Sequence, residues 1–145
     1  MGSGVSPLPF LVKVREMTVA GIIEQYNTER PNSVEDSLKL GWLEKCERMI
    51  IDTVILTHED APCEEDIEDH IANFGMDTEL YVNEPYDDLY LYFLDQRIAM
   101  NNNDNKRLNT ASTYYNNALL TYQQQYTRKH MSLRARKRLL RHEVL

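Results

Sequence analysis

Glycine, proline and cysteine are scarce in this chain, and each shortage narrows the kind of protein it can be. Five glycines and five prolines among 145 residues are few for a turn-rich all-β fold, so the composition favours helices. The two cysteines, Cys46 and Cys63, stand in unlike contexts, which argues against a disulfide framework and for a reducing compartment. The longest apolar runs, such as residues 49–51 and 54–56, are far too short to cross a bilayer. We expect a soluble cytosolic protein of one domain, with no membrane segment.

Familiar catalytic motifs are also missing. The sequence holds no glycine-rich phosphate loop and no G-x-S-x-G, H-E-x-x-H or C-x-x-C motif. It therefore predicts a protein that is not an enzyme and that needs no cofactor. One stretch contains metal-ligating residue types, but its spacing matches neither a standard zinc module nor an EF-hand loop: His58, Glu59, Asp60, Cys63, Glu64 and His70. We favour a solvated acidic loop, and a metal-dependent enzyme or metal-sensing module stays open as an alternative.

Basic residues are absent from the middle of the chain and concentrated at its end. Between His58 and Asp95 there are thirteen Asp or Glu residues and no Lys or Arg, whereas residues 127–145 hold seven Lys or Arg against the single Glu143. The net charge of −7 hides a dipolar molecule, which could attract copies of itself or a charged partner head to tail. This layout is more typical of an assembly component than of a catalyst.

Hydrophobic periodicity predicts an all-α fold, a small bundle of four main helices. The first helix is expected to follow Thr18 as N-cap and to end before Pro31, with an inward stripe of Val19, Ile22, Ile23 and Tyr26. The second begins at Ser33, whose spacing to Asp36 is that of a capping box. Its buried stripe is expected to be Val34, Leu38, Trp42, Cys46, Met49, Ile50 and Val54.

The second half of the chain predicts two more helices, paired as an antiparallel hairpin. The third begins with Pro85 at its first helical position, and Asn103 or Asp104 caps the fourth. The tyrosines on these helices are interpreted as core residues whose hydroxyls reach the surface. Residues 58–83, before the hairpin, are expected to form a long acidic loop containing a weak helix over residues 64–74, with Ile67, Ile71 and Phe74 facing inward.

Residues 131–145 form a basic C-terminal extension with a few apolar residues. As an exposed arm it could neutralise DNA phosphates, so a nucleic-acid-binding phage or bacterial regulator is the alternative function. It could instead dock on an acidic protein surface, or remain a solvated terminus. The net negative charge of the chain and the apolar residues among the arginines favour a protein partner; these residues are Leu133, Leu139, Leu140 and Val144.

Several segments follow one another in a recognisable order. A short helix from Met17 is followed by the turn at residues 30–33, a long helix over residues 38–50 and a variable segment. A Pro-Tyr-Asp-Asp-Leu-Tyr start at Pro85 and a tyrosine-rich segment over residues 114–126 come next. In this order and spacing, residues 17–130 resemble the small helical head–tail connector (head-completion adaptor) proteins of tailed bacteriophages. The resemblance implies an adaptor domain over residues 17–130 and a basic arm over residues 131–145. Residues 1–16 are not part of the family pattern, and we expect them to be a leader of recombinant origin or an extended arm.

The resemblance also implies a structural virion protein, a ring of about twelve copies below the portal that continues the DNA channel and joins capsid to tail. Such a ring forms in the host cytoplasm and lies in the virion neck. Its partners are other copies of itself, the portal protein, the next neck or tail-completion protein, and double-stranded DNA that passes without specific binding. Portal contact then falls to Arg134, Arg136, Lys137, Arg138, Leu139, Leu140 and Arg141. The residues expected to face the channel or the next ring are Glu59, Asp60, Glu64, Glu65, Asp66, Glu68 and Asp69.

Overall fold

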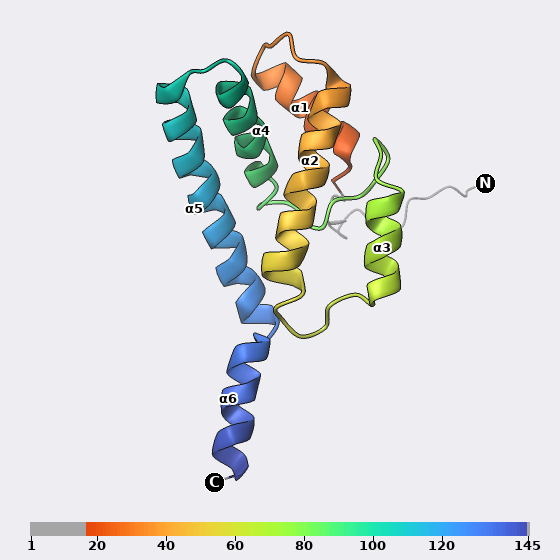
Figure 1. Cartoon of the computed structure of the whole chain (residues 1–145), viewed down its shortest axis with the longest axis vertical. Coiled ribbons are helices and arrows are strands. Elements are labelled where there is room, and N and C mark those ends of the chain that lie inside the picture. Colours follow the sequence, from red (N-terminus) through yellow and green to blue (C-terminus); the bar gives the residue numbers. More distant parts are fainter. Residues whose placement is uncertain (1–16, 145) are drawn as a thin grey trace, which may run out of the picture.

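The computed structural model describes residues 17–144, and their side chains as far as Arg141. Within these residues the chain is mostly helical, with six α-helices and no strand, so the predicted all-α class is confirmed (Figure 1). The expected leader, residues 1–16, and Leu145 lie outside the described residues, as do the side chains of residues 142–144.

Helix α1, Val19–Glu29, begins and ends where the sequence predicts. The Thr18 hydroxyl accepts a hydrogen bond from the Gly21 N–H at 3.1 Å, which satisfies one of the free amides of the first turn. Two more free amides of this turn are satisfied by residues distant in sequence, because Val19 N–H donates to the Thr78 carbonyl and Ala20 N–H to the Met76 carbonyl. The helix ends before Pro31, and its buried residues are the expected four: Val19, Ile22, Ile23 and Tyr26.

Helix α2, Asp36–Ile50, starts later than the sequence predicts. The expected capping box at Ser33 is wrong: the Asn32 side chain accepts a hydrogen bond from the Val34 N–H at 3.0 Å, and this local turn holds the backbone out of the helix. The buried face is also rotated from the expected stripe. Leu38 and Met49 are 45% and 47% exposed, whereas the polar residues Lys39 and Glu47 are buried.

The end of α2 continues without a break into a π-helical segment, η1, Ile51–Ile55. Its wide turn is closed by the hydrogen bond from Leu56 N–H to the Ile51 carbonyl at 2.9 Å. Four apolar side chains close together in sequence face the core here: Ile50, Ile51, Val54 and Ile55.

Helices α4, Asp88–Asn101, and α5, Asn105–Lys129, form the predicted antiparallel hairpin (Figure 1). Aromatic rings pair along its length, at 5.4 Å for Phe93 with Tyr115 and 5.5 Å for Tyr92 with Tyr114. The Asp104 side chain caps α5, as predicted, by accepting a hydrogen bond from the Arg107 N–H. The expected role of Pro85 is wrong, because Tyr86 N–H closes a turn onto Asn83 and α4 begins only at Asp88.

The hydrophobic core lies where α4 packs against α5, α2 and α1. Residues 58–83 run along the opposite side of α2 and include the expected short helix, α3, Glu64–Ala72 (Figure 1). Ile67 and Ile71 of α3, and Phe74 just after its end, pack on the core as predicted. Beyond α3 the chain is extended rather than loose: Leu80 and Val82 are buried, and Leu80 N–H donates to the Met17 carbonyl.

Candidate functional site

The basic C-terminal region is a helix that extends away from the rest of the molecule. Helix α6, Leu133–Val144, follows α5 and projects beyond the ends of α2 and α3 (Figure 1). Among the described residues nothing covers its leucines: Leu133 is 47% exposed, Leu139 52% and Leu140 53%. The expected fourth apolar anchor, Val144, belongs to the helix, but its side chain lies outside the described residues.

Helical spacing sorts the α6 side chains onto two different sides. At 3.6 residues per turn, Leu133 and Leu140 lie on one side, with Arg136 and Lys137 on its two flanks. We call these four residues the leucine face. A second side carries Arg134, Arg138 and Arg141, which follow one another at spacings of four and three, and we call it the arginine row. All of these side chains are exposed.

Backbone hydrogen bonds fix the base of α6 to the end of the α2–η1 helix. Leu133 N–H donates to the Thr57 carbonyl at 2.9 Å, and Glu59 N–H donates to the Met131 carbonyl at 2.9 Å. These bonds form an isolated antiparallel bridge between His58 and Ser132. The direction of α6 is therefore set by two parts of the chain, since it is joined covalently to α5 and by hydrogen bonds to residues 57–59.

His58 stabilises the same junction from inside. Its Nδ1 lies 2.7 Å from the Val54 carbonyl, so Nδ1 carries the proton, because a carbonyl can only accept. Its Nε2 lies 2.8 Å from the Thr127 hydroxyl on α5, and its ring packs edge-on against Tyr126. His58 is 9% exposed, which makes it a buried connection between η1 and α5.

The residues of the alternative metal site are not brought together. His58 faces the α5 junction, while His70 Nε2 donates to the buried carboxylate of Glu47 at 2.8 Å. Cys63 is exposed at the N-terminal end of α3. Within the part of the chain that the structure describes, no three His, Cys, Asp or Glu side chains gather as a metal site would require.

The acidic residues expected to face a channel or a neighbouring ring fall mostly on α3. Glu64, Glu65 and Asp66 occupy its first turn, where negative charge complements the helix dipole. Glu68 and Asp69 follow and are exposed, as is Asp60, whose carboxylate lies 3.4 Å from Nδ1 of His130. Glu59 is half-buried beside the base of α6. Five of these seven carboxylates therefore lie on a short helix, and Glu59 and Asp60 precede it.

A groove of about 520 Å³ separates α3 from the end of α2 and the start of η1. We call it the α2–α3 groove. Its walls contain the apolar side chains of Ile51, Ile67 and Ile71, together with Ala72. Charged residues Arg48, Asp52 and Glu68 complete the lining. Arg48 pairs with Glu44 at 2.9 Å, so the arginine charge is already compensated and the groove is acidic on balance.

The least expected residue is Glu47, which is fully buried among several hydrogen-bond donors. Its Oε1 accepts from the Tyr90 hydroxyl at 2.7 Å, and its Oε2 accepts from Tyr81 N–H at 3.0 Å as well as from His70. The Tyr90 hydroxyl in turn accepts from Val82 N–H at 3.1 Å. Burial, followed by the nearby Glu47 charge, raises the pKa of Tyr90 well above its ordinary value, so Tyr90 stays protonated and remains a donor. One carboxylate thus joins α2, α3, the extended segment and α4.

Lys39 is a second buried charge that the helical pattern does not reveal. It is 1% exposed, and its ammonium donates to the Asn27 side chain at 2.6 Å and to the Val34 carbonyl at 3.0 Å. Asp36 lies 3.5 Å away and supplies an opposite charge. These contacts join the start of α2 to the end of α1. The sequence signal for this burial is the spacing of Lys39, Leu43 and Glu47, which lie four residues apart and therefore share one face of α2.

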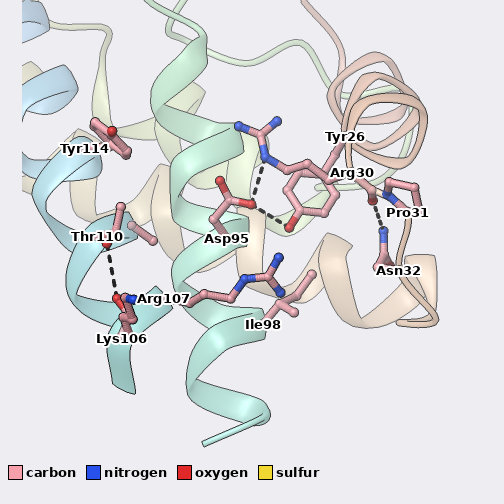
Figure 2. A pocket seen from close by; sticks show the side chains of 11 residues that line it. Tyr26, Arg30, Pro31, Asn32, Asp95, Ile98, Lys106, Arg107, Thr110 and Tyr114 are labelled. Atoms are coloured by element: carbon pink, nitrogen blue, oxygen red, sulfur yellow. Dashed lines mark hydrogen bonds and ion pairs between the residues drawn. The ribbon is translucent and has the colours of Figure 1, made fainter. Parts of the chain in front are cut away.

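A cavity of about 380 Å³ lies between the end of α1, helix α4 and the start of α5 (Figure 2). Its centre is Asp95, which accepts hydrogen bonds from the Tyr26 hydroxyl at 2.8 Å and from Arg30 Nε at 2.9 Å. Lys106 and Arg107 line the cavity from α5. Burial, then the hydrogen bond to Asp95, raises the pKa of Tyr26. The polar groups at its centre therefore bind one another, and they join α1 to α4.

No family model, curated protein or solved structure matches this chain. Among residues 17–144, no helix has both the length and the apolar character needed to span a membrane. Within the described residues, the exposed leucines and arginines of α6 are the clearest feature that the fold itself does not use.

Proposed function

We propose that this chain is a structural assembly protein, a head–tail connector adaptor of a tailed phage. The observation that carries the proposal is α6, a basic amphipathic helix whose leucines are about half exposed on a projecting element. The order of segments over residues 17–130, which resembles that family, supports the same function. In this proposal α1, α2, α4 and α5 form the body of the adaptor, α3 belongs to its acidic segment, and α6 is the docking arm.

The energetic argument for a protein partner rests on the uncovered apolar surface. Fully burying a leucine contributes about 1.5–3 kcal/mol, so three half-exposed leucines leave a substantial gain for the protein partners that cover them. The arginine row adds charge-assisted contacts to an acidic surface and speeds the encounter. A partner with a hydrophobic pocket and acidic residues fits α6 better than a nucleic acid, whose backbone offers no apolar pocket.

In the proposed neck, the portal protein is one such partner, and the arginine row provides the contact. Other copies of the chain complete a ring, the next neck or tail-completion protein binds its other side, and double-stranded DNA passes through. The net charge of −7 favours passage without binding, since like charges repel. The mechanism is geometric: a rigid body holds the ring, and α6 reaches the neighbour.

The proposal is tested by removing the arginine row. Replacing Arg134, Arg138 and Arg141 by Ala is expected to leave far-UV circular dichroism and thermal midpoint unchanged, because all three side chains are exposed. Binding to purified portal rings, measured by co-sedimentation, should be lost, as should the joining of heads to tails in a reconstitution assay. The matched control removes three exposed cations of the body, Lys45, Lys106 and Arg107, and should bind normally. A triple variant that still joins heads to tails would refute the assignment of α6.

One observation favours a second candidate, a nucleic-acid-binding regulator. Three arginines on one side of a projecting helix can contact consecutive phosphates. Such a protein would bind double-stranded DNA with an affinity that falls steeply with salt, and deletion of residues 131–145 would abolish the binding. Fluorescence anisotropy with a labelled duplex at several salt concentrations separates this function from the connector.

A further inference from the structure

We propose that α6 of one copy binds in the α2–α3 groove of a second copy, so that identical chains associate head to tail. This proposal rests on the proposed assembly function, because it names the contact between copies in the assembly. The surfaces that form this contact do not include the arginine row. Within the described residues, the groove and the leucine face are two complementary surfaces that remain accessible to a partner.

The groove has the chemistry that an amphipathic helix recognises. Ile67 and Ile71, both partly exposed, are one turn apart on α3, and the edge of the largely buried Ile51 lines the facing side from η1, which makes the floor of the groove apolar. Asp52 and Glu68 are exposed on the two opposite sides of this groove. Within residues 17–141 neither carboxylate forms an ion pair, so both charges are available to an incoming cation.

The leucine face of α6 presents the complementary pattern. Leu133 and Leu140 are seven residues apart, a rise of about 10 Å along the helix, and both are about half exposed. Arg136 and Lys137 flank them, one on each side. A leucine pair inserted between Ile51 and the α3 isoleucines would therefore place one cation near Asp52 and the other near Glu68. Apolar contact supplies the affinity, and the two ion pairs at the edges fix the orientation.

A second copy is the occupant because the chain's own α6 points elsewhere. The bridge at His58 and Ser132 directs α6 away from the body, beyond the base of α3, as Figure 1 shows. Folding back into the groove would break the bonds from Leu133 N–H and Glu59 N–H. Docking between copies needs no such change, and it leaves each end of a pair with a free groove or a free helix. A contact of this kind repeats, closing a ring when the rotation between copies allows it.

The two sides of α6 then have separate partners. The leucine face is buried against the neighbouring copy, and the arginine row stays accessible on another side of the same helix. Self-association and portal binding can consequently be disrupted by different substitutions. This separation makes the inference testable without a particle.

The test is a charge exchange in the full chain, measured by sedimentation velocity over a range of concentrations. The unaltered chain should show an average mass that rises above its 17.0 kDa with concentration. The helix variant, Arg136→Glu with Lys137→Glu, should stay monomeric because the carboxylates of the groove repel it. The groove variant, Asp52→Lys with Glu68→Lys, should also stay monomeric, because its new lysines repel Arg136 and Lys137 of the incoming helix. An equimolar mixture of the two should associate again, since every helix then faces a groove of opposite charge.

The control reverses the same number of charges on the other side of α6, with Arg134→Glu and Arg138→Glu. This variant should associate like the unaltered chain. A chain that is monomeric at every concentration, a mixture that does not associate, or a control that dissociates like the helix variant would each overturn the inference. If a chain loses portal binding but still self-associates, the contact between copies is supported and the connector function is not. If the chain is monomeric but still binds portal rings, only the contact between copies is refuted.

Discussion

The body and the C-terminal helix use charge in opposite ways. In the body, Glu47 and Lys39 are almost completely buried, and each is surrounded by hydrogen-bonding groups from other elements. In α6, Arg134, Arg138 and Arg141 are exposed alongside half-exposed leucines. A buried charge must be fully bonded within the fold, because an uncompensated one is costly, whereas an exposed charge leaves its contacts open. The body charges therefore hold the structure together, and the α6 charges are available to partners.

Raising the pH should unfold the body, because its buried tyrosines would then ionise, and this is the largest effect we expect. Burial, the first cause in each case, raises the pKa of Tyr90, Tyr115 and Tyr26 above the ordinary value of 10.0. Because the folded state favours the protonated phenol, the full stability is present below pH 10 and is lost progressively above it. Tyrosine absorbance at 295 nm and far-UV circular dichroism should change together, as a single unfolding transition. Ionisation of these tyrosines before any loss of helix would contradict their burial.

Replacing Glu47 by Ala should be the most damaging single substitution in the body. It leaves Tyr90, Tyr81 N–H and His70 without their acceptor, and removal of one partner from a buried ionic group costs about 3–5 kcal/mol of unfolding free energy. Urea denaturation measures the change. The matched control is Glu44→Ala on the same helix, whose pair with the exposed Arg48 contributes about 1 kcal/mol or less. Equal effects at both positions would contradict a structural role for the buried carboxylate.

The smallest effect is expected in α6, where the fold uses little of the side-chain surface. Leu140→Ala should change the free energy of unfolding by less than about 0.5 kcal/mol, because the side chain is 53% exposed. The same substitution at the fully buried Leu43 should cost about 2–5 kcal/mol. Both values come from denaturant titration of the two variants. A large loss at Leu140 would mean that α6 packs against its own chain.

Much of the helical organisation could be predicted because its determinants are local. Thr18 and Asp104 cap the two helices that they were predicted to cap, since a cap needs only a side-chain oxygen at the right distance along the chain. The hairpin of α4 and α5 follows from two apolar stripes joined by a short polar connection. The prediction at Ser33 is wrong because Asn32, one residue earlier, offers the backbone a competing turn.

The buried charges could not be predicted because their partners are far away in sequence. Glu47 receives its hydrogen bonds from Tyr81 and Tyr90, and apolar spacing along α2 says nothing about residues so distant. The same holds for the tyrosine hydroxyls, which were expected at the surface: that of Tyr90 is bonded to Glu47, and that of Tyr115 lies 3.8 Å from the Cys46 thiol. Local periodicity identifies which face is inward, but only the tertiary structure shows which polar groups can be satisfied there.

Of the candidate site, the sequence predicts the charge and not the geometry. The basic character of residues 131–145 and the acidity of residues 59–69 are evident from composition. The direction of α6 depends on the bridge between His58 and Ser132, and no sequence pattern indicates that these two positions lie together. The α2–α3 groove likewise depends on how α3 packs beside η1.

The junction at His58 also determines how the molecule bears mechanical load. A pull on α6 reaches α5 through the covalent chain and reaches η1 through the bonds of Leu133 N–H and Glu59 N–H. His58 links these two supports from within by contacting Thr127. Tension at the tip is thereby divided between two long helices, so neither has to unwind alone when the arm is strained.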